Sequence, residues 1–200
     1  METKSLIAAI AASLFLASTI TAQPIVQQRK GNFRAQGNIA GAYLFKQKIF
    51  MPYLTGDMDL FFDNHVALAG SVWVSLPISK IKSGLKQNHA VFGGINYHTL
   101  KKGRWDPYIC LTPGIGLVQA EETNGELVTR TRLSPVPLLS ASVGCNYYIG
   151  SIFNFFVKAQ GVSGQFFKLE HRAIRLDDLR LTAGLGFNFQ LWKPKILDKY

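Results

Sequence analysis

Apolar and polar residues alternate with a period of two along most of this chain, and the alternation is clearest near the end of the sequence. Between Leu179 and Leu191 every second residue is apolar, and the intervening residues are polar or glycine. A period of two is typical of a β-strand, whose side chains point alternately to opposite faces. A strand with one apolar and one polar face borders either a protein core or lipid.

The same pattern predicts eight strands, with short and long connections alternating from the second strand onward. The predicted strands cover residues 32–44, 53–62, 66–76, 89–100, 107–119, 137–149, 153–166 and 179–192. An even number of antiparallel strands, with tight turns at one end and long loops at the other, is typical of bacterial outer-membrane barrels. We therefore expect an all-β fold, an eight-stranded antiparallel up-and-down transmembrane β-barrel.

The N-terminus has the features of an export signal. Lys4 supplies a positive charge, residues 6–16 form an apolar run, and Ala22 is a small residue suited to cleavage. The run is shorter than the roughly 20 residues that a spanning helix needs. We expect a cleaved signal peptide over residues 1–22 and a single barrel domain over residues 23–200, which places the mature protein in the outer membrane.

The polar faces of the strands supply the side chains that we expect inside the barrel. Eight strands enclose a space that side chains just fill, so a packed network is expected rather than an open channel. Unpaired buried charges are costly, and we expect the cations of this set to pair with Asp57 and Asp59. The predicted lumen network consists of Arg34, Asp57, Asp59, Asn96, His98, Lys158 and Arg180. A path for protons or small solutes through the same groups is the alternative.

Aromatic residues fall near the ends of the predicted strands, where amphipathic rings sit well at the headgroup level of a membrane. They are Tyr43, Phe50, Tyr53, Phe61, Phe62, Trp105, Tyr108, Tyr147, Tyr148, Phe166, Phe167 and Trp192. This arrangement predicts two aromatic girdles, although aromatic residues also end strands in soluble sheets.

Cys110 and Cys145 lie on opposite faces of their strands, so their side chains diverge and we expect two free thiols.

The chain is basic, with 22 Lys and Arg against 12 Asp and Glu and a formal net charge of +10. With the mature N-terminus in the periplasm, the loops on the outer side form a basic extracellular rim. This rim contains Lys46, Lys48, Lys80, Lys82, Lys86, Arg172 and Arg175. Attraction to the phosphates of lipopolysaccharide is one interpretation, and ordinary solvated loop charge explains the rim equally well. No motif or compartment supports nucleic-acid binding.

Three segments carry a resemblance to a known family. Residues 92–98 (FGGINYH), 101–108 (KKGRWDPY) and 113–117 (PGIGL) resemble the outer-membrane β-barrel domain family, which includes the small OmpA-type and OmpX-type barrels and is frequent in Bacteroidota. The resemblance covers the mature chain and specifies architecture rather than activity. Such barrels often end at an aromatic residue that directs insertion. Here residues 193–200 follow Trp192, so either Trp192 or Tyr200 serves that purpose.

We expect a monomeric barrel with a structural or surface-interaction role in the cell envelope. Its expected partners are outer-membrane lipid, lipopolysaccharide and an unknown envelope protein, with no cofactor and no metal. A narrow solute channel is the alternative. A lipid A-modifying enzyme has less support, because His98 is the one histidine with inward parity and no motif joins it to a serine and an acid. A soluble lipocalin-like barrel would reverse the two faces.

Overall fold

The computed structural model describes residues 29–76, 84–100, 103–124, 127–169 and 172–192, and over this part of the chain the structure consists of β-strands and their connections. The strands are β1 (Asn32–Leu44), β2 (Ile49–Phe61), β3 (Val66–Ser75), β4 (Gly84–His98), β5 (Trp105–Asn124), β6 (Leu127–Arg130), β7 (Ser134–Tyr148), β8 (Phe153–Leu169), β9 (Arg172–Arg175) and β10 (Asp178–Gln190). These residues include no helix of the length and hydropathy that crossing a membrane requires. The predicted signal peptide lies outside the described residues.

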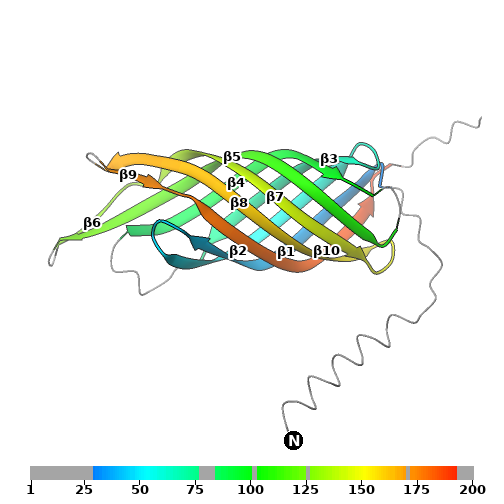
Figure 1. Cartoon of the computed structure of the whole chain (residues 1–200), viewed down its shortest axis with the longest axis horizontal. Coiled ribbons are helices and arrows are strands. Elements are labelled where there is room, and N and C mark those ends of the chain that lie inside the picture. The colour runs from blue at the N-terminus through cyan, green and yellow to red at the C-terminus, as the bar shows by residue number, and fades with distance from the viewer. Residues whose placement is uncertain (1–28, 77–83, 101–102, 125–126, 170–171, 193–200) are drawn as a thin grey trace, which may run out of the picture.

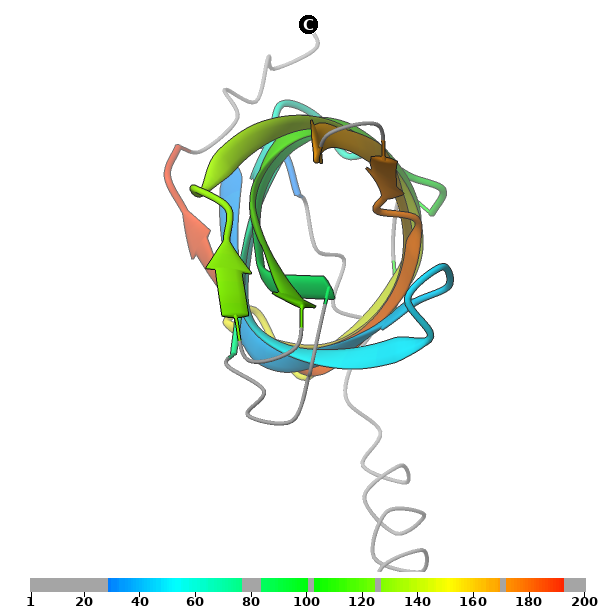
Figure 2. The ribbon, with the colours of Figure 1, turned by 90° about the vertical axis from the view of Figure 1, so that its left-hand side faces the viewer.

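Eight of the strands close into an antiparallel barrel, which confirms the predicted fold class. Each of β1, β2, β3, β4, β5, β7, β8 and β10 pairs with the next, and β10 returns to pair with β1 from Asn32↔Gln190 to Leu44↔Asp178. The view along the barrel in Figure 2 shows this closed ring. The two short strands β6 and β9 pair with β5 and β8 beyond the barrel wall. Closure leaves the barrel without a free edge, which is what a chain in lipid requires.

The two ends of the barrel differ in their connections. One end, the turn end, holds the short connections between β2 and β3, between β4 and β5 and between β7 and β8, together with the start of β1 and the end of β10. The opposite end, the hairpin end, carries β6 and β9, which project on the left of Figure 1. The predicted strand 89–100 begins earlier, at Gly84, and β5 continues to Asn124, so parts of the predicted long loops are strand.

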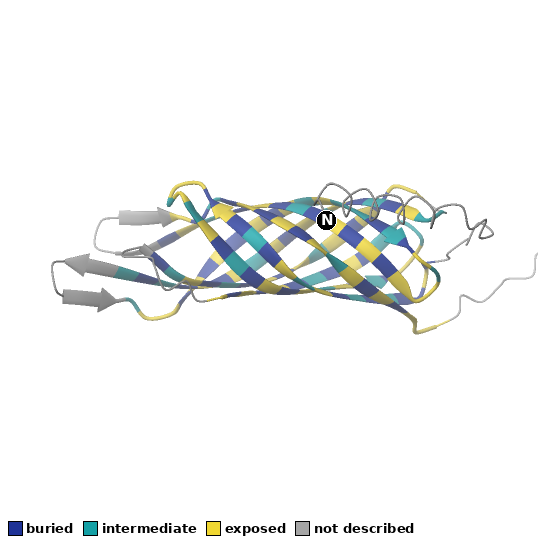
Figure 3. Ribbon diagram, turned by 90° about the horizontal axis from the view of Figure 1, so that it is seen from below, coloured by how far each residue is buried: buried dark blue, intermediate teal, exposed yellow. Residues whose placement is uncertain are grey.

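The outer surface of the barrel is apolar, with large side chains such as Ile39, Leu54, Ile95 and Leu181 exposed. Buried and exposed residues alternate along every strand of the wall (Figure 3). This arrangement differs from a soluble lipocalin-like barrel, which would need a polar exterior. It agrees with the outward apolar band that lipid-embedded barrels carry.

The barrel interior has two zones. Toward the hairpin end it is filled by apolar side chains, among them Leu44, Met51, Leu85, Phe166 and Leu176. Toward the turn end it is filled by polar and charged side chains. The sequence analysis predicted the polar zone from strand parity, whereas it did not predict the apolar one.

Several aromatic residues that were predicted for the membrane girdles lie inside the barrel instead. Each of them is buried, because the alternation along its strand directs the side chain inward. They are Tyr53, Phe61, Tyr108, Tyr148 and Phe166.

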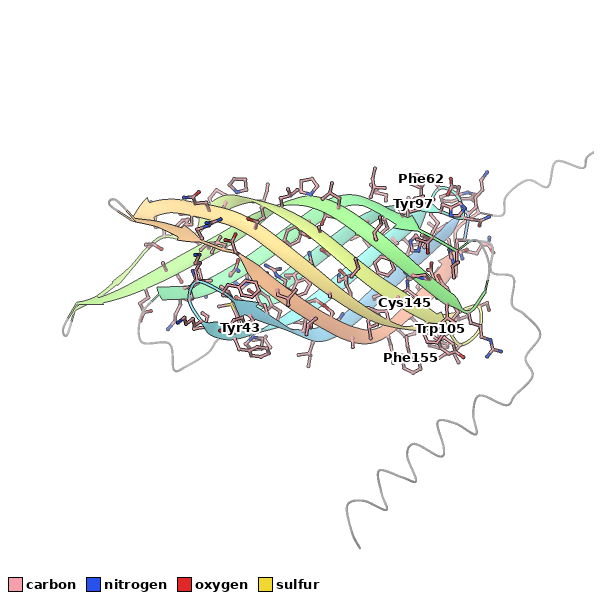
Figure 4. The ribbon with its side chains drawn as sticks, viewed as in Figure 1. Tyr43, Phe62, Tyr97, Trp105, Cys145 and Phe155 are labelled. Carbon is pink, nitrogen blue, oxygen red and sulfur yellow. The ribbon has the colours of Figure 1, made fainter. Side chains whose placement is uncertain are left out.

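The girdles are made by outward-facing rings. Phe62, Tyr97, Trp105 and Phe155 lie toward the turn end and Tyr43 toward the hairpin end (Figure 4), and all are exposed. Phe50 and Trp192 are exposed as predicted and Tyr147 is half-buried. The side chain of Phe167 is outside the described set.

Candidate functional site: the closed lumen

The carboxylate of Asp106 is the centre of the polar zone. Asp106 is the second residue of β5, and the sequence analysis placed it in a turn. Its Oδ1 lies 3.0 Å from Nη2 of Arg29 and 2.7 Å from Nδ1 of His98. Its Oδ2 accepts hydrogen bonds from Nη1 of Arg34 at 3.3 Å and from the hydroxyl of Tyr148 at 2.9 Å. The side-chain amide of Asn146 also donates to Oδ2, at 3.2 Å. Five side chains therefore converge on one buried carboxylate.

Arg34 and Asp59 form the predicted ion pair of adjacent strands. Asp59 Oδ2 accepts from Nη2 of Arg34 at 2.6 Å and from Nε at 3.0 Å, and the amide of Asn96 donates to Asp59 Oδ1. The guanidinium also lies 5.1 Å from the centre of the Phe61 ring. The additional hydrogen bonds of this buried pair help to offset the cost of removing its two charges from water.

Lys158 pairs with Asp57 across the barrel, at 2.6 Å between Nζ and Oδ1. An internal cavity of about 30 Å³ lies beside this pair, and Asp57, Asn96, Cys110 and Gln160 contribute to its lining. Within the described part of the chain, Asp57 Oδ2, Asn96 Oδ1 and Gln160 Oε1 have no protein donor. The cavity is larger than the roughly 10–15 Å³ that one water molecule needs, so water can satisfy these oxygens. It is far smaller than a solute path.

Arg180 pairs with Asp178 and not with Asp57 or Asp59, which corrects the expectation from the sequence. Nε of Arg180 lies 2.8 Å from Asp178 Oδ1 and Nη2 lies 3.0 Å from Oδ2. The guanidinium stacks 4.6 Å from the centre of the Trp73 ring and 5.2 Å from that of Tyr53. Asp178 precedes Arg180 by two residues and shares its face, so parity alone could have identified this partner.

Arg29 closes the turn end of the lumen. It lies before β1, and its Nη1 donates to the backbone oxygens of Asn64 at 2.8 Å and Leu100 at 2.5 Å, while Nη2 reaches Asp106. One side chain thus ties two turns to the interior carboxylate. The sequence analysis missed Arg29 because no strand pattern covers it.

The structure places all seven predicted lumen residues inside the barrel, in the half nearer the turn end except for Arg180. Together with the residues that the sequence analysis missed, the described interior holds four cations and four carboxylates in direct contact. The cations are Arg29, Arg34, Lys158 and Arg180, and the carboxylates are Asp57, Asp59, Asp106 and Asp178. The interior is therefore balanced in charge.

Three members of the predicted basic rim meet at the hairpin end. Lys46 and Lys48 are exposed in the turn between β1 and β2. In the same turn, Gln47 Nε2 donates to the backbone oxygen of Arg175 at 2.9 Å. The side chain of Arg175 is 59% exposed and contacts Asp177 at 3.0 Å.

The other predicted rim residues do not join this group in the described structure. Lys86 lies 3.4 Å from Glu121. Lys80 and Lys82 lie outside the described residues, and the side chain of Arg172 is not described.

Cys110 and Cys145 are both free, and the described residues contain no cluster of His, Cys, Asp and Glu suited to a metal ion.

Comparison with known proteins relates this chain to others by fold and not by sequence, because no protein-family model and no curated protein matches it. Among solved structures it is similar to the N-terminal β-barrel domain of Pseudomonas aeruginosa OprF, with a TM-score of 0.55 and 17% identity over 82% of this chain and 100% of that one. Neisserial surface protein A gives a TM-score of 0.56 and 12% identity, over 79% of this chain and 96% of that one.

Ail, the attachment invasion locus protein of Yersinia pestis, gives a TM-score of 0.56 and 11% identity over 80% of this chain and 99% of that one. A second structure of Ail, in complex with the heparin analogue sucrose octasulfate, gives a TM-score of 0.53 and 13% identity over 80% and 99%. At these identities the likeness concerns the fold. The chain has the fold of the small eight-stranded outer-membrane β-barrels.

Proposed function

We propose that this protein is an integral outer-membrane barrel with a closed lumen, serving a structural or surface-interaction role in the cell envelope. The apolar outer surface and the outward aromatic residues near both ends support insertion in a bilayer. Outer-membrane barrels have short periplasmic turns and longer extracellular loops. The turn end then faces the periplasm and the hairpin end faces outside.

The closed lumen is the observation that carries this proposal. On the outer side, apolar residues such as Leu85, Phe166 and Leu176 fill the interior, and each of these three residues is at most 2% exposed. On the periplasmic side, the charged groups pair with one another and Arg29 bridges two turns. An ion entering from either side would have to lose its hydration and displace these packed side chains.

Conductance in planar bilayers tests the closed lumen. We expect the folded wild-type barrel to give no steady single-channel steps, with a general porin as the positive control for insertion. Steady steps from the wild-type protein would contradict the proposal and favour a narrow solute channel. The Asp57→Asn variant then distinguishes a path through the lumen, because removing a lumen charge changes ion selectivity only in such a path.

At the outer surface, we propose that Lys46 and Lys48 of the basic rim bind the anionic groups of lipopolysaccharide. Lys46 and Lys48 are exposed and have no carboxylate partner among the described residues. Ail, which shares the fold, was solved with a polysulfated heparin analogue. Exposed charges of one sign attract such anions through a field that salt screens.

The rim is tested with a Lys46→Ala and Lys48→Ala double variant. We expect weaker binding to lipopolysaccharide vesicles and a smaller dependence of binding on salt concentration. Lys86→Ala is the matched control, because Lys86 already contacts Glu121. Equal binding by the double variant and the wild type would leave the rim as ordinary solvated charge.

The proposal assigns no catalysis to the barrel. His98 is buried in the lumen, where its Nδ1 is hydrogen-bonded to Asp106. Its ring contacts the rings of Phe61 and Tyr108 and is therefore separated from the lipid face. We expect cells with and without the protein to have lipid A of the same mass. A mass change that depends on His98 would support the lipid A-modifying enzyme instead.

A further inference from the structure

One sector of the outer surface is recessed. On β7, β8 and β10 the outward positions include Ala141, Ala159, Gly161 and Ala183, whereas Leu, Ile and Met side chains stand out on much of the remaining wall. Two hollows of about 570 and 640 Å³ lie over these small residues. They share Val143 and Ala159, so they form one continuous groove, which we call the acyl groove.

The walls of the acyl groove are apolar and come from strands on both sides. Ile109 and Leu111 of β5 border it on one side, and Leu179 and Leu181 of β10 border it on the other. Both hollows are shallow and open outward, so they form a channel along the wall rather than an enclosed pocket. The groove thus has the shape and the lining of a site for a hydrocarbon chain.

The periplasmic end of the groove meets an aromatic and cationic edge. Cys145 lines the groove, and Tyr147 follows two residues later on the same face, about 7 Å along the strand. The Tyr147 ring lies 4.8 Å from that of Trp105, and Nη1 of Arg104 is 3.5 Å from the Tyr147 hydroxyl. Figure 4 shows Trp105, Cys145 and Phe155 gathered toward this end.

Arg104 is a cation suited to bind an external anion. Among the described residues no carboxylate lies within ion-pair distance of it, in contrast to every buried cation of the lumen. Trp and Tyr rings settle at the headgroup level of a bilayer, and basic residues at that level attract anionic lipids. Charge and hydrophobicity are therefore ordered along the groove as they are along a phospholipid.

We propose that the acyl groove binds one anionic phospholipid of the periplasmic leaflet, with a hydrocarbon chain over Ala159 and Gly161 and the phosphate at Arg104. A second copy of the barrel fits less well, because a symmetric contact would set two concave faces against each other. The inference rests on the proposed membrane location and orientation. It is independent of the rim, which lies at the opposite end.

Native mass spectrometry of the barrel, reconstituted in bilayers with equal amounts of phosphatidylglycerol and phosphatidylcholine, tests the inference. Folding and insertion are checked first by the heat-dependent shift on a gel. We expect the wild type to retain one phosphatidylglycerol about fivefold more often than one phosphatidylcholine. Arg104→Gln should bring this ratio close to one, and Ala159→Phe should abolish retention of both lipids.

Val72→Phe is the matched control, because Val72 is an outward, exposed residue of β3 that lies outside the acyl groove. We expect it to retain lipid as the wild type does. Equal retention of both lipids by the inserted wild type, or unchanged retention in Ala159→Phe, would overturn the inference and leave the proposed function intact. A barrel that does not insert would overturn both.

Cross-linking tests the second copy as occupant. Cys145 is outward and lines the groove, so a barrel-to-barrel contact here would give a Cys145 disulfide dimer under mild oxidation in bilayers. We expect no such dimer at low protein density. A dimer that is lost in Cys145→Ser would overturn the lipid assignment.

Discussion

At the scale of single residues, Asp106 has the most partners of the lumen carboxylates. Its partners come from the segment before β1 and from β1, β4 and β7, and they are Arg29, Arg34, His98, Asn146 and Tyr148. A carboxylate that accepts several charge-assisted hydrogen bonds is strongly held in its ionised form. Its removal leaves two buried guanidinium groups with a partner missing.

We therefore expect Asp106→Asn to lower the free energy of unfolding by about 3–5 kcal/mol, the cost of breaking a buried ion pair. Urea unfolding in detergent micelles measures this change, with the different gel migration of folded and unfolded protein as the readout. Asp177→Asn is the control, since Asp177 pairs with an exposed Arg175 and should cost at most about 1 kcal/mol. Similar losses in the two variants would contradict a special role for Asp106.

Gly31 closes the seam between the two ends of the chain. Its φ is +82°, and a Cβ there would collide with the backbone oxygen of Trp192. We expect Gly31→Ala to destabilise the barrel by at least about 1–2 kcal/mol, the cost of a left-handed backbone with a side chain. The measurement is the same urea titration. Gly37→Ala should have little effect, because a Cβ at Gly37 meets nothing within 4 Å.

At the scale of elements, strand length separates the membrane part from the exposed part. A spanning strand needs about 9–11 residues, whereas β5 has 20 and β8 has 17. Their surplus residues pair with β6 and β9 and extend the wall beyond the barrel (Figure 1). The tight turns at the other end have no such extension, which gives the barrel its two unlike ends.

The turn between β2 and β3 gives a prediction about pH. Asp63 Oδ1 accepts the backbone N–H of His65 at 2.6 Å and of Val66 at 2.7 Å, and these bonds lower the pKa of Asp63 below its ordinary value. A depressed pKa adds stability above the unfolded pKa, and this stability is lost as pH falls through the folded value.

Asp63→Ala should therefore have a lower free energy of unfolding than the wild type at neutral pH. This difference in free energy should disappear in acid, below the pKa of folded Asp63. Unfolding titrations at about pH 7 and about pH 2 measure the difference in free energy of unfolding between the two proteins at each pH. Asp63→Asn keeps an acceptor oxygen and should lose less stability than the alanine variant. An equal difference in free energy of unfolding at both pH values would show that the charge of Asp63 does not stabilise the turn.

At the scale of the whole molecule, barrel closure unites the other features. Closure pairs β1 with β10 and brings Arg34 within 3.2 Å of the Tyr148 hydroxyl, 114 residues along the chain. It also turns the apolar faces of all eight strands outward. A closed barrel of this kind resists detergent until it is heated, because its backbone hydrogen bonds leave no edge at which unfolding can begin.

Cell fractionation with a gel of unboiled and boiled samples is the corresponding measurement. We expect the protein in the outer-membrane fraction, with the unboiled form migrating differently from the boiled form. The Asp106→Asn variant should shift at a lower temperature than the wild type. A freely soluble periplasmic protein without a heat-dependent shift would contradict the membrane location.

The sequence alone predicted the eight strands, the closed barrel and the face on which each lumen residue lies. These features depend on local information, because alternation with a period of two assigns a side chain to a face whatever its neighbours are. Arg34, Asp59 and Lys158 were placed inside for this reason. The same parity would have placed Tyr108 and Tyr148 inside as well, had their position near strand ends not been given more weight.

The pairing of those residues was decided only by the tertiary structure. Which carboxylate meets Lys158, why Asp106 has five side-chain partners and where Arg29 lies depend on strand register and on the closure of β1 against β10. The acyl groove likewise appears only when the small residues of β7, β8 and β10 come side by side. Such contacts join residues far apart in the chain, and their geometry is set by the tilt and stagger of the whole barrel.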